Sequence, residues 1–267
     1  MNLQSRLHTW AALRAGNVKP RTREYHREII EFIGRAWPEK FASPADAITE
    51  SDLALFIARI SRLSATRFNA IVTMLRAALP AAVRLRRRRV QVKERPILSQ
   101  LEFSRLLGEL EGRPRSHSNL VIRFLAHTGL RISEARQLRW ENVNMDKKYF
   151  FVPGQVSKSG RPRAIPFVNG VSVVLEGLRE ASAGRETILP QAEAQTSLRR
   201  ACERAGLPRL SHHSFRHHFA TRCIEAGVDV PTVARWLGHQ DGGALLSRVY
   251  FHLLDEHSRQ MAEKVEI

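Results

Sequence analysis

Cysteine is scarce in this sequence, and the two that occur fit no covalent framework. Cys202 and Cys223 are the only cysteines among 267 residues, and they do not form a Cys-x-x-Cys pair. A fold held by disulfides, or a zinc site built on paired thiolates, is therefore not indicated. We expect both cysteines to be small buried apolar residues, and we expect the protein to work in the cytoplasm, where thiols stay reduced.

Long apolar runs are also missing. No stretch of the sequence is long and apolar enough to span a lipid bilayer. The first ten residues, MNLQSRLHTW, lack the apolar segment of a secretory signal. The sequence therefore favours neither a membrane-spanning nor an exported protein.

Acidic residues are few in comparison with basic ones. Asp and Glu number 26 and Lys and Arg number 43, so the net charge is +17, while a hydrophobic content of 43% is ordinary for a globular protein. A folded chain this basic needs a polyanionic partner or a strongly anionic surface. Nucleic acid is the first candidate partner, and a lipid surface is the second.

The N-terminal third of the chain has the pattern of helices. Apolar residues recur with a helical period in two stretches, and a third stretch, residues 51–63, begins at Ser51, which we expect to cap it. The two apolar stripes are Tyr25, Ile29, Phe32 and Ile33, and Phe68, Ile71, Val72 and Leu75. These patterns predict a helical domain over residues 1–85.

A basic run follows the helical region. Residues 84–95, RLRRRRVQVKER, hold seven basic side chains and one acidic side chain, and Pro96 comes next. Because like charges at this density repel one another, such a run persists more easily in water or with phosphates that neutralise it. We therefore expect a basic linker at 86–96, and a second domain at 97–267.

The second domain opens with helical signals and then changes period. Ser99 and Glu102 form a capping box ahead of an apolar run, and a later helix ends at Gly129. Residues 149–152 and 163–167 flank a tip rich in glycine and serine, which predicts a β-hairpin. Helical patterns then resume. The fold class is therefore expected to be mainly α, with a small antiparallel sheet.

The stretch LSHHSFRHHFATRC, residues 210–223, places four histidines around one arginine. His213 and His217 would share a helix face and could both bind a metal. Ser214 stands where a zinc protease has glutamate, however, and no nearby Cys, Asp or Glu supplies a third ligand at a usual spacing. His213 and Arg216 also share a face, near a helix start that attracts anions. The segment by itself leaves a phosphate site and a plain polar helix face open.

Short motifs elsewhere in the domain set this cluster in context. LAHTGLRISEARQL contains Arg131, SKSGRPRAIP contains Lys158, LGH ends in His239, and VYFH contains Tyr250. With the histidine cluster they give the ordered set Arg131, Lys158, His213, Arg216, His239 and Tyr250. This set, within residues 96–264, resembles the catalytic domain of the tyrosine recombinases, the phage integrase family. Residues 1–85 are similar to the core-binding domain of that family.

The resemblance implies a fold, a reaction and partners. A helical core-binding domain and a mostly helical catalytic domain with a small antiparallel sheet would clamp double-stranded DNA. The protein would be a site-specific recombinase that cuts and rejoins DNA strands through a covalent 3′-phosphotyrosine. It would need no cofactor and no metal, and it would act as a tetramer of identical subunits on two DNA sites, without a membrane.

The chemistry of a phosphodiester gives the expected residues their roles. Arg131 and Arg216 suit the non-bridging oxygens, because a guanidinium binds two oxygens at once. His213 is the candidate base that accepts the proton of the nucleophile Tyr250. The resemblance assigns protonation of the leaving 5′ oxygen to Lys158, and a hydrogen bond to the phosphate to His239.

The other three histidines of the cluster have no catalytic role in this scheme. His217 is expected to support the phosphate site, and His212 and His218 are expected to be polar surface residues. Three other functions stay open on the sequence alone: a type IB topoisomerase, a catalytically silent DNA-binding protein, and a hydrolase with a histidine-ligated metal.

Overall fold

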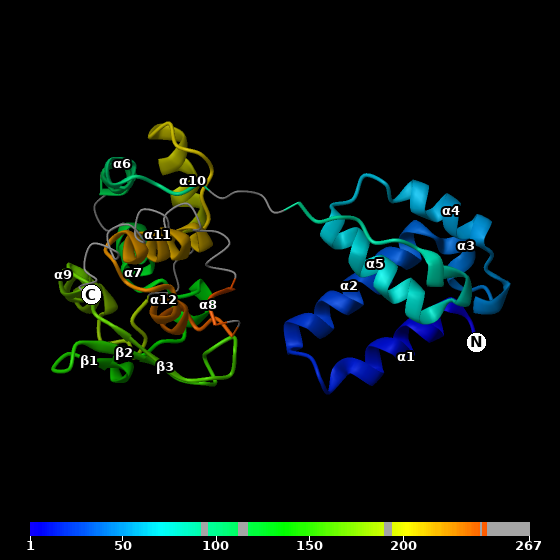
Figure 1. Cartoon of the computed structure of the whole chain (residues 1–267), viewed down its shortest axis with the longest axis horizontal. Coiled ribbons are helices and arrows are strands. Elements are labelled where there is room, and N and C mark those ends of the chain that lie inside the picture. The colour runs from blue at the N-terminus through cyan, green and yellow to red at the C-terminus, as the bar shows by residue number, and fades with distance from the viewer. Residues whose placement is uncertain (92–95, 112–116, 190–193, 241, 245–267) are drawn as a thin grey trace, which may run out of the picture. The chain divides into compact units, whose positions relative to one another are not determined.

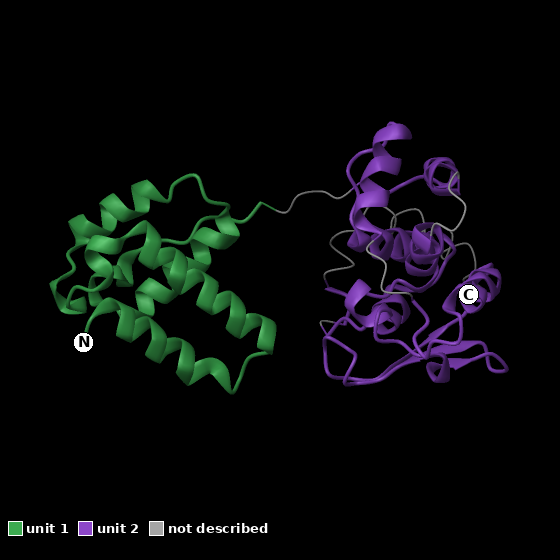
Figure 2. Ribbon diagram, turned by 180° about the vertical axis from the view of Figure 1, so that it is seen from behind, with its two compact units in different colours: residues 1–94 green, residues 95–267 purple. Residues whose placement is uncertain are grey.

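The chain folds into two compact units, residues 1–94 and 95–267 (Figure 2). Each unit has its own apolar core. Within the part of the chain that the structure describes, every helix is too short or too polar to cross a lipid bilayer. This structure is a computed structural model, and it describes residues 1–91, 96–111, 117–189, 194–240 and 242–244.

Helices build unit 1. They are α1 (Leu3–Ala15), α2 (Pro20–Ala36), α3 (Pro38–Phe41), α4 (Glu50–Arg59) and α5 (Ala65–Ala78), with two short 3-10 helices, η1 (Ala45–Ala47) and η2 (Pro80–Arg84) (Figure 1). The predicted stripe of α5 is confirmed, because all four of its members are buried. On α2, Ile29 and Ile33 are buried, while Tyr25 and Phe32 are partly buried against the same core.

Side-chain caps set the starts of the unit 1 helices. The Asn2 carboxamide oxygen accepts the Ser5 N–H at 2.8 Å ahead of α1. Thr49 and Asp52 form a capping box at α4, in which each side chain accepts the other's backbone N–H. The prediction that Ser51 caps this helix is wrong, because the hydroxyl of Thr49 already accepts the N–H at the third helical position.

The side-chain packing of unit 1 includes Arg88, inside the basic run. The Asn69 side chain bonds both backbone groups of Arg88, accepting its N–H at 2.7 Å and donating to its carbonyl at 2.9 Å. The Arg88 guanidinium lies 3.7 Å from the ring centre of Phe68 and donates to the Ser61 carbonyl at 2.8 Å. One arginine of the run is therefore a packed part of unit 1.

Unit 2 is mostly helical around a small sheet. Its helices are α6 (Gln100–Glu111), α7 (His117–Thr128), α8 (Ile132–Ala135), α9 (Val171–Ser182), α10 (Gln195–Arg204), α11 (His212–Glu225) and α12 (Val230–Leu237), with the short η3 (Trp140–Asn142). Its strands are β1 (Val143–Asn144), β2 (Tyr149–Val152) and β3 (Arg163–Pro166) (Figure 1). The expected fold class, mainly helical with a small antiparallel sheet, is confirmed.

The sheet has the order β1-β2-β3, and both pairings are antiparallel. The β2–β3 register pairs Phe150 with Ile165 and Val152 with Arg163. Phe150, Val152 and Ile165 are fully buried, whereas Phe151 between them is 43% exposed, as the alternation of a strand with one buried face requires. The predicted hairpin is therefore confirmed, and Arg163 is the polar residue on its buried face.

The core of unit 2 holds the helices that carry the site. α7 packs against both α9 and α11, and α12 packs against β3 and α11. The predicted capping box opens α6, since the Glu102 carboxylate accepts the Ser99 N–H at 2.8 Å. Both cysteines are buried and unpaired, as predicted, and burial raises the pKa of the Cys223 thiol to about 12.

Candidate active site

Gly129 starts the segment that positions Arg131. Its φ is +62°, and a Cβ atom there would lie 2.5 Å from the Phe219 ring and 2.6 Å from Leu237. Only glycine therefore fits the turn that ends α7. The chain continues into α8 with Arg131 as its N-cap residue. This turn presents the partly exposed Arg131 side chain at the start of α8.

Glu134, in the first turn of α8, is the buried acid at the centre of the site. The Arg131 guanidinium donates to Glu134 Oε1 at 2.9 Å, and the Lys158 backbone N–H donates to the same oxygen at 3.3 Å. Arg163 donates to Glu134 Oε2 at 2.6 Å. Burial alone would raise the pKa of Glu134, but the hydrogen bond and charge of Arg163, with the charge of Arg131, lower that pKa overall. The carboxylate is therefore ionised at neutral pH.

Lys158 lies in the loop between β2 and β3, with an exposed side chain. Gly154 and Gly160 let the two arms of this loop approach, because a Cβ atom on Gly154 would be 2.7 Å from the Gly160 carbonyl oxygen. The Gln240 side chain donates to the Ser159 carbonyl at 3.3 Å. This bond joins the loop to the segment that follows α12.

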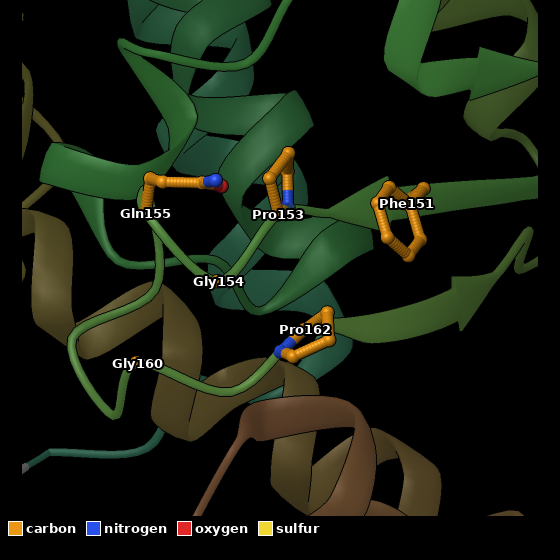
Figure 3. Close-up of a pocket in the computed structure, with 6 residues that line it drawn as sticks. All are labelled: Phe151, Pro153, Gly154, Gln155, Gly160 and Pro162. Carbon is orange, nitrogen blue, oxygen red and sulfur yellow. The ribbon is translucent and has the colours of Figure 1, made fainter.

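A hollow of about 600 Å³ lies at the base of the same loop. Figure 3 shows Phe151 on β2, with Pro153 and Pro162 near the two ends of the loop, around this space. None of the residues that line it has a titratable side chain. The hollow therefore offers apolar contact and no acid–base chemistry, and we place the candidate site at the loop tip instead.

α11 supplies His213 and Arg216. The His213 side chain is exposed, and its ring centre lies 5.0 Å from that of His217 in an edge-to-face pair. Arg216 is only 3% exposed, and its guanidinium donates to the Gly129 carbonyl at 2.9 Å and the Leu237 carbonyl at 2.6 Å. Arg216 thus connects the turn before Arg131 with the end of α12, and these contacts fix the plane of its guanidinium.

The end of α12 positions His239. Gly238 adopts φ +70°, and the N–H groups of Gly238 and His239 return to the carbonyls of Arg235 and Ala234, at 3.1 and 2.9 Å. The two carbonyls left over accept from arginines: Trp236 from Arg163 at 2.7 Å and Leu237 from Arg216 at 2.6 Å. All four terminal carbonyls of α12 are thus bonded, which fixes the chain where it leads into His239.

The structure brings most of the predicted residues to one region of unit 2. Contacts through Glu134, Gly129 and Leu237 join four segments: the start of α8, the β2–β3 loop, the N-terminal half of α11 and the end of α12 (Figure 1). These segments carry Arg131, Lys158, Arg216 and His239. His213 lies on the same helix face as Arg216, three residues earlier. Tyr250 lies outside the described residues. The arrangement presents two fixed guanidiniums, a lysine and two imidazoles, which suits a phosphoryl group.

Sequence reasoning missed the roles of two residues here. No role was predicted for Glu134, and Arg163 was predicted only as the first residue of a hairpin strand. The alternation of residues in RAIPF could have indicated that Arg163 is buried, because in a strand it lies on the same face as Ile165. A charged residue on a buried strand face requires a buried partner of opposite charge.

His218 corrects a prediction. It was expected on the surface, but it is 5% exposed, and its ring centre lies 4.5 Å from that of Phe103 on α6. The helical period explains the difference, because His218 is one turn from Phe215 and Ser214 and therefore lies on the same buried face of α11. His212, at the start of the helix, is partly exposed. Burial, with the charge of Arg222, lowers the pKa of His218 to about 4.

This lowered pKa predicts how stability depends on pH. An unfolded histidine is protonated below pH of about 6.5, while folded His218 stays neutral down to about pH 4. The free energy of unfolding should therefore fall as pH drops through this window, by on the order of 3 kcal/mol. In urea titrations from pH 7 to pH 4, His218→Leu should show a shallower fall than wild type. Cys223→Ala, on the same helix, should keep the wild-type slope, and equal slopes in all three proteins would contradict the argument.

The histidine cluster forms no metal site among the described residues. No group of three or more His, Cys, Asp or Glu side chains lies close enough together there to hold an ion. Among the described residues, His213 and His217 pair with each other edge to face, which brings two imidazoles together. A structural or catalytic zinc site normally uses three or four protein ligands.

Three comparisons set this site beside known proteins. Residues 96–257 match the sequence model of the phage integrase family. The tyrosine recombinase XerA of Thermococcus kodakarensis is 28% identical over 182 residues, which cover 64% of this chain and 62% of that protein. The chain therefore spans less than two thirds of the length of this relative.

Two solved structures show the same fold. The integrase of the transposon Tn1549, in complex with transposon right end DNA, superposes with a TM-score of 0.79 at 18% identity, over 99% of both chains. A lambda integrase tetramer bound to a Holliday junction superposes with a TM-score of 0.75 at 21% identity, over 90% of this chain and 78% of that one.

Proposed function

Since the chain belongs to the phage integrase family, we propose that it is a site-specific DNA recombinase. It cuts one strand of duplex DNA, holds the cut end as a covalent 3′-phosphotyrosine, and rejoins it to a new partner strand. One observation carries this proposal. Hydrogen bonds of the buried Glu134 and Arg216 side chains bring the segments of Arg131, Lys158, Arg216 and His239 to one place, with their backbone fixed before DNA arrives.

The two arginines stabilise the transition state. A phosphodiester under attack gathers charge on its non-bridging oxygens, and fixed cations stabilise this charge better than mobile water does. Arg216 is held by two backbone carbonyls, and Arg131 by the buried carboxylate of Glu134. Neither guanidinium has to reorganise when the charge develops, which is the requirement for strong electrostatic catalysis.

The remaining residues move protons. Tyr250 attacks the phosphorus, and the pKa of an ordinary phenol, near 10, means that a base must take its proton at neutral pH. His213 is that base. Lys158, on the exposed tip of the hairpin loop, gives a proton to the leaving 5′ oxygen, and His239 donates a hydrogen bond to the phosphate. The phosphotyrosine keeps the energy of the broken ester, so that rejoining needs no further input.

The partners are two duplex DNA sites and further copies of the same chain. The net charge of +17 and the exposed Arg84, Arg86, Arg87 and Arg89 of the basic run suit a phosphate backbone. Residues 1–85 act as the core-binding domain, residues 86–96 as the linker and residues 97–267 as the catalytic domain, so that two domains clamp the duplex. A tetramer on paired sites is the proposed working assembly, by analogy with the lambda integrase tetramer.

A nicked suicide substrate tests the proposal. Such a duplex loses a short fragment after cleavage, so the covalent product accumulates and migrates slowly in a denaturing gel. The substrate is taken from the DNA that flanks the gene. An adduct that forms only on one sequence supports a site-specific recombinase. Failure to form any adduct, or relaxation of supercoiled plasmids without a specific site, would contradict it.

Chelation provides a separate prediction. Adduct formation should keep its full rate in EDTA, because the proposed chemistry uses only side-chain cations and acids. The measurement compares single-turnover rates before and after dialysis against the chelator. Loss of activity in EDTA, and its return with zinc alone, would move His213 and His217 from the phosphate to a metal.

A further inference from the structure

Arg163, which none of the expected roles includes, contacts three segments of the candidate site. Its side chain is 5% exposed, on the buried face of the hairpin. Nη2 donates to Glu134 Oε2 at 2.6 Å, Nε donates to the Trp236 carbonyl at 2.7 Å, and Nη1 lies 3.4 Å from Ser157 Oγ. All three nitrogens of one rigid fork are used, each toward a different segment.

Each of these segments carries a proposed catalytic residue. Glu134 bonds the side chain of Arg131, and Ser157 immediately precedes Lys158 in the hairpin loop. Trp236 lies in the last turn of α12, three residues before His239. Arg163 touches none of the three catalytic side chains in these contacts, so its influence on them passes through their neighbours.

Gly238 shows how closely Arg163 packs at the end of α12. A Cβ atom on Gly238 would lie 3.1 Å from Arg163 Nη1 and 3.2 Å from both Cδ and Cζ. Glycine suits this position for two reasons: it adopts a φ of +70° without strain, and it leaves room for the Arg163 guanidinium. The turn that leads to His239 and the position of Arg163 determine each other.

We propose that Arg163 is a positioning residue that sets Arg131, Lys158 and His239 in one common arrangement. This inference rests on the proposed function, and it deepens it. The three catalytic residues come from segments far apart in the sequence, and a single buried side chain fixes their spacing. Strand cleavage should thus depend on Arg163 although its contacts are with the neighbours of the catalytic side chains.

Charge gives Arg163 a second effect on Arg131. The ionised Glu134 lies between two guanidiniums, with Oε2 taken by Arg163 and Oε1 by Arg131. Without Arg163, Arg131 would face the buried carboxylate without a second guanidinium beside it, and it would be drawn toward both oxygens. Its attraction to the carboxylate would then compete with its binding of the DNA phosphate.

The variant Arg163→Lys tests the proposal. Lysine keeps the positive charge beside Glu134 but has no planar fork, so it cannot bond three segments at once. In hydrogen exchange of the full chain without DNA, the backbone N–H groups of Lys158 and His239 should both exchange about tenfold faster than in wild type. Exchange in unit 1 should not change. Faster exchange in only one of the two segments, or throughout unit 2, would overturn the common arrangement.

Cleavage of the suicide substrate gives the second readout. Arg163→Lys should form adduct at least about tenfold more slowly at saturating protein, with DNA affinity unchanged. The control Arg204→Lys alters an arginine that bonds Glu109 at 2.7 Å, between α10 and α6, and it should cleave at the wild-type rate. A wild-type rate in Arg163→Lys would overturn the proposal.

A double-mutant cycle separates positioning from general damage. Because Arg163 also positions Lys158 and His239, the loss caused by Arg163→Lys should shrink, but not vanish, in an Arg131→Ala background. An undiminished tenfold loss in that background would contradict an effect that passes through Arg131, and with it the common arrangement. If wild type forms no adduct, the proposed function fails, and the exchange experiment alone decides whether Arg163 couples the segments.

Discussion

Replacing Tyr250 with phenylalanine should abolish covalent capture of DNA and leave DNA binding within about twofold of wild type, since phosphate contacts elsewhere carry the affinity. The substitution removes one oxygen atom, and this atom is the one that bonds phosphorus in the proposed intermediate. No other change in the chain should have a larger effect on cleavage. Suicide-substrate gels measure the adduct, and gel shifts measure the binding.

The rarity of tyrosine provides matched controls for this experiment. Tyr25 and Tyr149 are the only others in the chain. Tyr149 pairs with Pro166 in the β2–β3 ladder, and Tyr25 packs against the core of unit 1. Tyr149→Phe and Tyr25→Phe should both form adduct at the wild-type rate. An adduct in Tyr250→Phe, or a peptide map that places it on another tyrosine, would refute the assignment.

Arg216→Lys should slow cleavage by at least about a hundredfold, the scale seen when one fixed stabiliser of a developing negative charge is lost. Lysine keeps the charge, but a single ammonium cannot bond the Gly129 and Leu237 carbonyls and also face the phosphate as a planar fork does. Binding should weaken far less, because other phosphate contacts remain. Adduct formation at saturating protein, with affinities from gel shifts, measures both quantities.

Arg222 offers the control for Arg216. It lies on the same helix and pairs with Glu225 at 3.0 Å, with its side chain 35% exposed. Arg222→Lys should cleave within about threefold of wild type, because an exposed ion pair contributes little. A rate close to wild type in Arg216→Lys would remove Arg216 from the proposed mechanism.

The sequence predicted the elements of unit 2 well where local chemistry decides them. The Ser99–Glu102 capping box and the turn at Gly129 need only neighbours in sequence, and both form as expected. The hairpin was recognised from its alternation and its glycine-rich tip. The order of motifs predicted the family, and the family model confirms it.

The sequence failed where contacts between distant segments decide the outcome. Glu134 and Arg163 are 29 residues apart, so no local pattern shows that they share a buried hydrogen bond. His218 was expected to be exposed because it is polar, yet its ring packs on Phe103 from another helix. At α4 the miss was local, because Thr49 and Asp52 have the spacing of a capping box, which favours Thr49 over Ser51 as the cap. The catalytic roles of the six predicted residues stay predictions.

The anchoring of Arg88 also limits the length of the tether between the units. Ile97, nine residues further along the chain, packs against the core of unit 2. A fully extended chain of this length reaches at most about 32 Å, which is less than one turn of duplex DNA at about 34 Å.

In the proposed complex with DNA, a short tether couples the binding of the two units. Once one unit has bound, the tether keeps the other near the same stretch of duplex, where its effective concentration is on the order of millimolar. Each unit can then bind weakly while the whole chain binds tightly. Weak units release the duplex one at a time, which allows a protein to exchange positions on DNA without dissociating from it.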